Sequence, residues 1–91
     1  MAAKAEISWK RRTEEGERLE IYAHHVGNRW NFYVRSRRYD RWQRVEQPPL
    51  EDWLELLDGV RRRVARRLLR PEEVERVEKS IHENFPEVEL E

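Results

Sequence analysis

The chain has 91 residues, a length typical of one folded domain, and we predict a single domain over residues 1–91. It contains no cysteine, which excludes a disulfide framework, a thiol nucleophile and a thiolate metal site. The formal net charge is zero, but residues 1–70 carry an excess of basic side chains, and an acidic excess in residues 71–91 cancels it.

Apolar residues form no long run in this sequence. A helix that spans a bilayer needs about 18 of them in succession, and a secretory signal needs a shorter apolar run near the N-terminus. The first residues, from Met1 to Glu6, do not contain such a run. We therefore expect a cytoplasmic protein that makes no contact with a membrane.

Alternating apolar and polar residues predict strands in the first half of the chain. The alternation covers residues 5–12, 18–26 and 29–37, and it is typical of strands with one buried face. A fourth strand can follow at residues 40–46, but the turn before it lacks glycine, so the faces of Trp42 and Val45 stay open. The sequence predicts an antiparallel meander of three or four strands within residues 5–46, ended by Pro48 and Pro49.

The dipeptide Gly27-Asn28 lies between the second and third predicted strands and suits a two-residue type II′ turn. This turn predicts one register, in which both sets of apolar residues fall on one face of the sheet. A shift by one residue would move one set to the other face. The predicted pairs are Val26–Arg29, His25–Trp30, Ala23–Phe32 and Ile21–Val34, with His24–Asn31, Tyr22–Tyr33 and Glu20–Arg35 among the remaining positions.

Two helices are predicted after the sheet. Apolar residues recur at helical spacing from Leu50 to Leu68, which predicts a helix over residues 49–68 that continues through Gly59. Pro71 opens a second helix with acidic residues in its first turn, and Pro86 stops it, which predicts a helix over residues 71–85. We expect an α+β fold in which both helices pack on one face of the sheet. The expected core includes Trp9, Trp30 and Trp53.

Six arginines stand among the ten residues from Arg61 to Arg70. On a continuous helix some of them gather opposite the apolar stripe, where they form a ridge that could bind phosphates. The alternative is a solvated face that the following acidic helix neutralises, and we favour it because that helix begins within a few residues. The arginines of this ridge are Arg62, Arg63, Arg66 and Arg70, and the acids expected to neutralise the ridge are Glu72, Glu75 and Glu78.

The predicted sheet face that bears the tyrosine pair is a second candidate surface. Aromatic rings among arginines can stack on the bases of single-stranded RNA. The same residue types also stabilise a solvated sheet face, or pack against a protein partner or a second copy of the chain. The candidate residues on this face are Tyr22, Tyr33, Arg35 and Arg37.

Features that would indicate an enzyme are missing from the sequence. It has no glycine-rich phosphate loop and few residues from which to build a nucleophile triad. His24 and His25 are neighbours on a predicted strand and point to opposite faces, so they do not bind one metal ion together. We expect no catalytic activity, no cofactor and no metal site. The leading hypothesis is a non-catalytic interaction module that associates with itself or docks on a protein partner, and the alternative is a module that binds single-stranded RNA.

Overall fold

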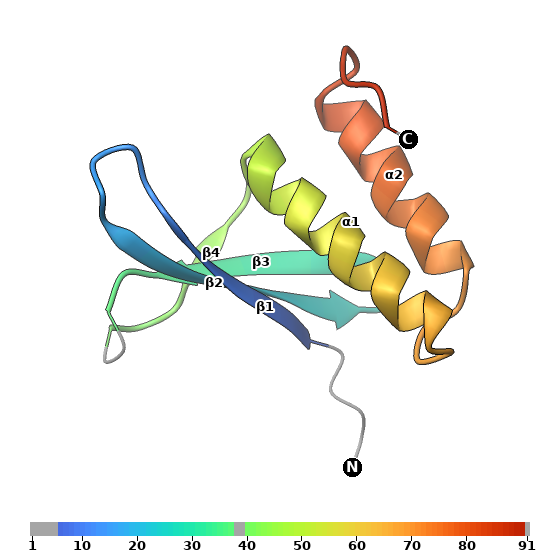
Figure 1. Ribbon diagram of the computed structural model, residues 1–91, viewed down its shortest axis with the longest axis horizontal. Coiled ribbons are helices and arrows are strands. Elements are labelled where there is room, and N and C mark those ends of the chain that lie inside the picture. The colour runs from blue at the N-terminus through green and yellow to red at the C-terminus, as the bar shows by residue number, and fades with distance from the viewer. Residues whose placement is uncertain (1–5, 38–39, 91) are drawn as a thin grey trace. The chain divides into compact units, whose positions relative to one another are not determined.

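The computed structural model describes residues 6–37 and 40–90, and the chain separates after Pro48 into two compact units. The first, the sheet unit, contains the strands, and the second, the helical unit, contains the helices (Figure 1). The predicted α+β class is confirmed, because an antiparallel sheet precedes two helices. A single domain with both helices packed on the sheet stays a prediction. The elements are β1 (Glu6–Arg12), β2 (Arg18–Val26), β3 (Arg29–Arg35), β4 (Gln43–Val45), α1 (Leu50–Ala65) and α2 (Glu72–Asn84).

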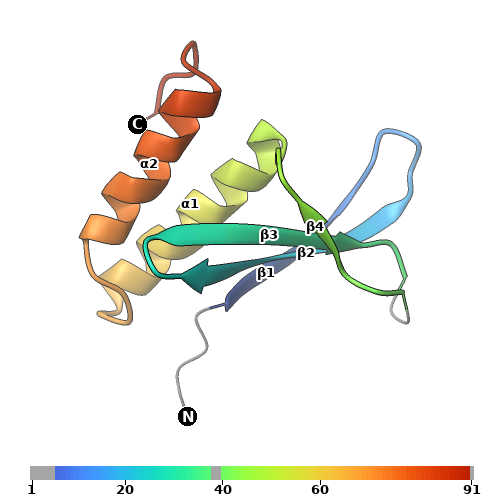
Figure 2. The same ribbon diagram turned by 180° about the vertical axis from the view of Figure 1, so that it is seen from behind.

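The four strands form a meander in which each strand pairs with its neighbours along the chain, in the order β1-β2-β3-β4 (Figure 2). Thr13 closes the turn between β1 and β2. Its backbone N–H donates to the Glu17 carbonyl at 2.8 Å, and its hydroxyl accepts the Glu17 N–H at 3.1 Å. Gly16 in this turn has a φ of 90°, a conformation that glycine adopts without steric cost. The turn thus reverses the chain so that β2 runs antiparallel to β1.

The register predicted between β2 and β3 is confirmed in every pair from Val26–Arg29 to Glu20–Arg35. Gly27 has a φ of 60°, whereas Asn28 is not among the residues with positive φ, which is the combination that a type II′ turn requires. The turn dipeptide therefore fixes which residues of the two central strands lie opposite each other.

Successive strand residues alternate between two faces of the sheet, which we call the tyrosine face, bearing Tyr22 and Tyr33, and the apolar face. The pairing of β4 with β3 places Val45 opposite Phe32 and therefore on the apolar face. Trp42 lies on the tyrosine face, where its indole contacts the Tyr22 ring. The structure thus settles the two positions that the sequence left open. The buried residues of the apolar face are Ile7, Ile21, Ala23, Trp30 and Phe32.

The first helix, α1, ends at Ala65, three residues before the predicted end at Leu68. Arg67 adopts a left-handed conformation with a φ of 64°. The N–H of Arg67 donates to the Val64 carbonyl at 2.9 Å, and the N–H of Leu68 donates to the Arg63 carbonyl at 2.8 Å. This pair of hydrogen bonds is a Schellman motif, which terminates the helix. Leu68 is 66% exposed, so it does not extend the buried stripe of α1.

The helical unit buries apolar side chains from both of its helices. As predicted, α1 runs without a break through Gly59. An ion pair between the Arg61 guanidinium and the Glu78 carboxylate, 2.9 Å apart, joins α1 to α2. Both side chains are partly open to water, so this pair contributes about 0–1 kcal/mol and apolar burial contributes more. The buried apolar residues are Trp53, Leu56, Leu57, Val60, Val77 and Ile81.

Candidate interaction surface

Three aromatic rings and one guanidinium group gather on the tyrosine face and form the aromatic cluster (Tyr22, Tyr33, Arg35 and Trp42). Tyr22 and Tyr33 are cross-strand partners whose rings stack, with centroids 4.8 Å apart and planes 14° apart. The Trp42 indole meets the Tyr22 ring at 89°, with centroids 4.7 Å apart. The guanidinium carbon of Arg35 lies 4.2 Å from the Trp42 ring centroid. The cluster is therefore continuous from β2 and β3 to the residue that precedes β4.

Arg35 is held in the cluster from two sides. Its Nε donates to the Glu20 carboxylate at 2.8 Å across the β2–β3 ladder, while its guanidinium carbon lies over the Trp42 ring. The Arg35 side chain is 22% exposed, so water screens this ion pair less than it screens a fully exposed pair. Glu20 thus neutralises the charge of Arg35 within the chain, and Arg35 covers one face of the Trp42 ring.

The rest of the tyrosine face is predominantly basic. Arg44 donates a hydrogen bond of 3.1 Å to the Asn31 side-chain oxygen, and Nδ1 of His24 lies 4.0 Å from the Glu6 carboxylate. By strand alternation the face carries six basic and two acidic side chains, a net charge of +4 with histidine neutral. An anionic surface is therefore the complementary partner for this face. The basic residues are Lys10, Arg12, Arg18, Arg29, Arg35 and Arg44, and the acidic ones are Glu6 and Glu20.

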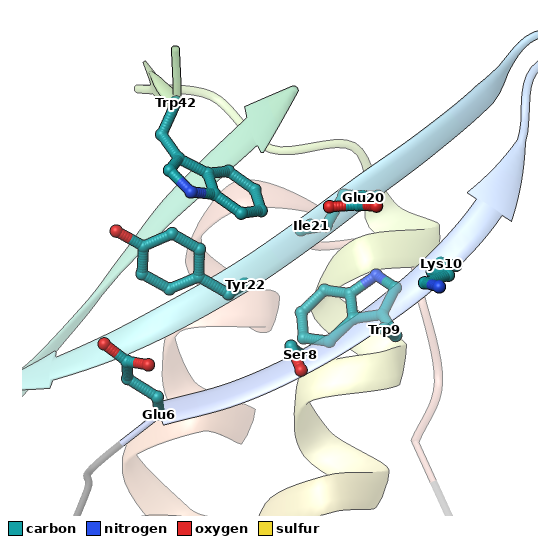
Figure 3. Close-up of a pocket in the computed structure, with 8 residues that line it drawn as sticks. All are labelled: Glu6, Ser8, Trp9, Lys10, Glu20, Ile21, Tyr22 and Trp42. Carbon is teal, nitrogen blue, oxygen red and sulfur yellow. The ribbon is translucent and has the colours of Figure 1, made fainter. Parts of the chain in front are cut away.

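A hollow of about 490 Å³ lies beside the aromatic cluster, over β1 and β2. Figure 3 shows Tyr22 and Trp42 along one side of the hollow, and Ser8 and Lys10 of β1 along the other. Aromatic, basic and acidic groups all contribute to its wall, so it offers both apolar contact and hydrogen bonding. The hollow is large enough to receive a protruding side chain of a partner. The lining residues are Glu6, Ser8, Trp9, Lys10, Glu20, Ile21, Tyr22 and Trp42.

The position of Tyr22 in the cluster changes its acidity. Partial burial raises the pKa of the Tyr22 phenol above its ordinary value of 10.0, and the nearby Tyr33 and Glu6 side chains raise it further. Each of these effects disfavours the phenolate. A tyrosine phenol carries its proton at neutral pH, and the raised pKa of Tyr22 extends this protonated, hydrogen-bond-donating state to higher pH.

Of the four residues predicted for this face, the structure places three in the aromatic cluster. Arg37 is not among them, because β3 ends two residues before it. Trp42 joins the cluster although the sequence left its face open. The odd separation of Trp42 and Val45 indicates only that an extended segment places them on opposite faces, and the pairing of Val45 with Phe32 decides which face each one takes. The three predicted residues in the cluster are Tyr22, Tyr33 and Arg35.

The predicted arginine ridge does not form one helical face. Arg66 and Arg70 follow the end of α1 and lie in the connection to α2. Arg62 and Arg63 remain on α1, where Arg62 pairs with Asp58 at 3.3 Å and the Arg63 guanidinium donates to the Gly59 carbonyl at 3.3 Å. Within residues 6–37 and 40–90, the ion pair that joins the two helices uses Arg61, and neither Arg66 nor Arg70 forms an ion pair. The predicted neutralisation of this ridge by α2 is therefore not seen in the described residues.

The two neighbouring histidines lie on opposite faces of the sheet, because His24 pairs with Asn31 and His25 with Trp30. In the described part of the chain, no three side chains of the metal-binding types come together. Neither helix in that part of the chain has the length and apolar composition needed to cross a membrane. Comparisons with protein-family models, curated proteins and solved structures find no match to the chain. The function must therefore be inferred from the chemistry of the tyrosine face.

Proposed function

We propose that the chain is a non-catalytic interaction module whose tyrosine face binds an acidic surface of a protein partner. The aromatic cluster beside the hollow is the observation that carries this proposal. Tyrosine, tryptophan and arginine are the residue types most enriched among the side chains that dominate binding energy at protein interfaces. In this cluster they are already in contact with one another, so binding would cost little loss of side-chain freedom.

The arrangement of the rings favours a protein over single-stranded RNA. Base stacking uses open ring faces with free cations beside them. Here Tyr22 and Tyr33 each cover one face of the other ring, and Arg35 covers one face of Trp42. The charge of Arg35 is also paired with Glu20. Fewer ring faces and one fewer cation are therefore available to a nucleic acid than the residue types alone suggest.

The charge of the tyrosine face disfavours its association with the same face of a second copy. Six basic and two acidic side chains on each copy would meet the same set on the other. Like charges placed together across an interface cost binding free energy. An acidic protein surface meets the same face without this repulsion, so we assign the tyrosine face to a different protein.

Site-specific photo-crosslinking in the source organism tests this assignment. A benzophenone amino acid replaces Arg44, which is exposed and lies opposite Tyr33 on the tyrosine face. The matched control carries the same group at Glu75, an exposed residue of α2. We expect a covalent adduct with another protein from position 44 and not from position 75. Introducing Trp42→Ala into the first variant should abolish the adduct, because it removes the centre of the cluster.

Two results would contradict the proposal. The first is an adduct from position 44 that contains a second copy of the chain alone, since the tyrosine face would then be a contact between copies. The second is binding of a uridine oligonucleotide that weakens steeply with salt and is lost in Tyr33→Ala, which is the behaviour of an RNA-binding face. For a protein-binding face, we expect no detectable binding of that oligonucleotide at physiological salt.

A further inference from the structure

The strand β1 is an edge of the sheet. Among residues 6–37 and 40–90, its backbone pairs with β2 on one side and with no strand on the other. An edge strand presents unpaired N–H and C=O groups that can pair with another strand. The sequence of this edge is Glu-Ile-Ser-Trp-Lys-Arg-Arg, with an acid at its beginning and cations at its end.

We propose that the β1 edges of two copies pair in antiparallel fashion and continue the sheet across a two-fold axis at Trp9. This proposal concerns the backbone edge of β1 rather than the aromatic cluster, and it does not depend on the partner assigned to the tyrosine face. In the register that pairs all seven residues of β1, Trp9 lies opposite itself. The remaining pairs are Glu6 with Arg12, Ile7 with Arg11 and Ser8 with Lys10 of the second copy, each formed twice.

Charge complementarity supports this register. At full overlap the acid Glu6 meets the cation Arg12, and Lys10 meets an uncharged serine rather than another cation. If the two-fold axis lay at Lys10 instead of Trp9, the Lys10 side chains of the two copies would lie directly opposite each other and repel. The register with the most backbone pairs is therefore also one without a directly opposed pair of like charges.

The sheet contains an unfavourable cross-strand pair that such pairing would relieve. Within one copy, Arg12 lies directly opposite Arg18 of β2, and like charges in this position destabilise a sheet. In the proposed dimer, Glu6 of the second copy lies on the other side of Arg12 and offsets this repulsion. Arg12 would then lie between Arg18 of its own chain and Glu6 of the second copy.

The proposed pairing also places the same face of each sheet on the same side of the dimer. Directly opposed residues of paired strands lie on the same face, and Glu6 and Arg12 both belong to the tyrosine face. The tyrosine faces of the two copies therefore form one continuous surface. Because a single pair of short strands buries little area, we expect a weak dimer that dissociates in the micromolar range.

Sedimentation equilibrium of the full chain at several concentrations tests the proposal. The wild-type chain should show a mass above 11.3 kDa that rises with concentration. We expect Glu6→Arg and Arg12→Glu each to weaken the dimer about tenfold or more, because each places like charges opposite each other at two symmetric positions. The double variant, which exchanges the two charges, should restore dimerisation. Glu14→Arg, an equal charge change at an exposed turn residue outside β1, should leave it unchanged.

Thermal unfolding of the same variants at low concentration separates dimerisation from folding. Arg12→Glu should raise the Tm of the monomer, because it places an acid instead of a like charge directly opposite Arg18. The same substitution should weaken the dimer, so the two readouts move in opposite directions. A monomer at every concentration, or a dimer that the charge exchange fails to restore, would overturn the proposal. Trp42→Ala should leave the dimer intact, so failure of the tyrosine-face assignment is distinguishable from failure of this one.

Discussion

The rings of Tyr22 and Tyr33 stack across the β2–β3 ladder, with centroids 4.8 Å apart and planes 14° apart. Aromatic pairs of this kind contribute about 0.5–1.5 kcal/mol beyond the burial of their area. We expect a double-mutant cycle with Tyr22→Leu and Tyr33→Leu to show a coupling energy of this size in urea unfolding. A coupling energy near zero would mean that the stacked geometry adds nothing to the stability of the sheet.

The raised pKa of Tyr22 predicts a loss of stability at alkaline pH. In the unfolded chain the phenol loses its proton near its ordinary pKa of 10.0, whereas in the folded chain it keeps the proton to higher pH. The folded state then binds more protons, so the free energy of unfolding falls as pH rises above about 10. Equilibrium unfolding of the wild type and of Tyr22→Phe across this range should show a shallower fall in the variant. Parallel curves would exclude a contribution from Tyr22.

The left-handed residue at the end of α1 predicts a stabilising substitution. Arg67 has a φ of 64°, which costs a residue with a Cβ about 1–2 kcal/mol and costs glycine little. We expect Arg67→Gly to raise the free energy of unfolding by roughly 0.5–1 kcal/mol, since glycine's greater freedom in the unfolded chain offsets part of the gain. The neighbouring Arg66 has a φ of −93°, so Arg66→Gly should bring no such gain and serves as the control in the same denaturant titration.

Two adjacent residues of α1, Trp53 and Leu54, are buried to different extents, so we expect their replacement by alanine to lower stability by very different amounts. Trp53 is 8% exposed, whereas Leu54 is 40% exposed. Removal of a large buried aromatic side chain costs about 3–5 kcal/mol, a large part of the stability of a chain this short. We therefore expect Trp53→Ala to lower the Tm strongly or to prevent folding, and Leu54→Ala to have a much smaller effect. Similar shifts for the two variants would contradict the burial of Trp53.

The central hairpin could be predicted from the sequence because its determinants are local. Strand alternation has a period of two, and Gly27-Asn28 permits a two-residue turn, so one register satisfies both. That register also predicts the contact between Tyr22 and Tyr33, which forms half of the aromatic cluster. The continuity of α1 through Gly59 follows likewise from the phase of its apolar residues.

Two other features depended on geometry that the sequence pattern does not signal. Trp42 follows a turn without glycine and precedes a strand of three residues, so its place on the tyrosine face depended on how β4 pairs with β3. The end of α1 was missed because a left-handed arginine, Arg67, occupies the position where glycine ordinarily signals a helix end. In both places the local preference of the chain is weak, and hydrogen bonds and ring contacts formed in the folded structure decide the conformation. Local sequence patterns were sufficient to predict the first three strands, the register of the central hairpin and the existence of two helices. Only the folded structure shows that Trp42 completes the aromatic cluster and that α1 ends before Arg66, because the first depends on the pairing of β4 with β3 and the second on the left-handed backbone of Arg67.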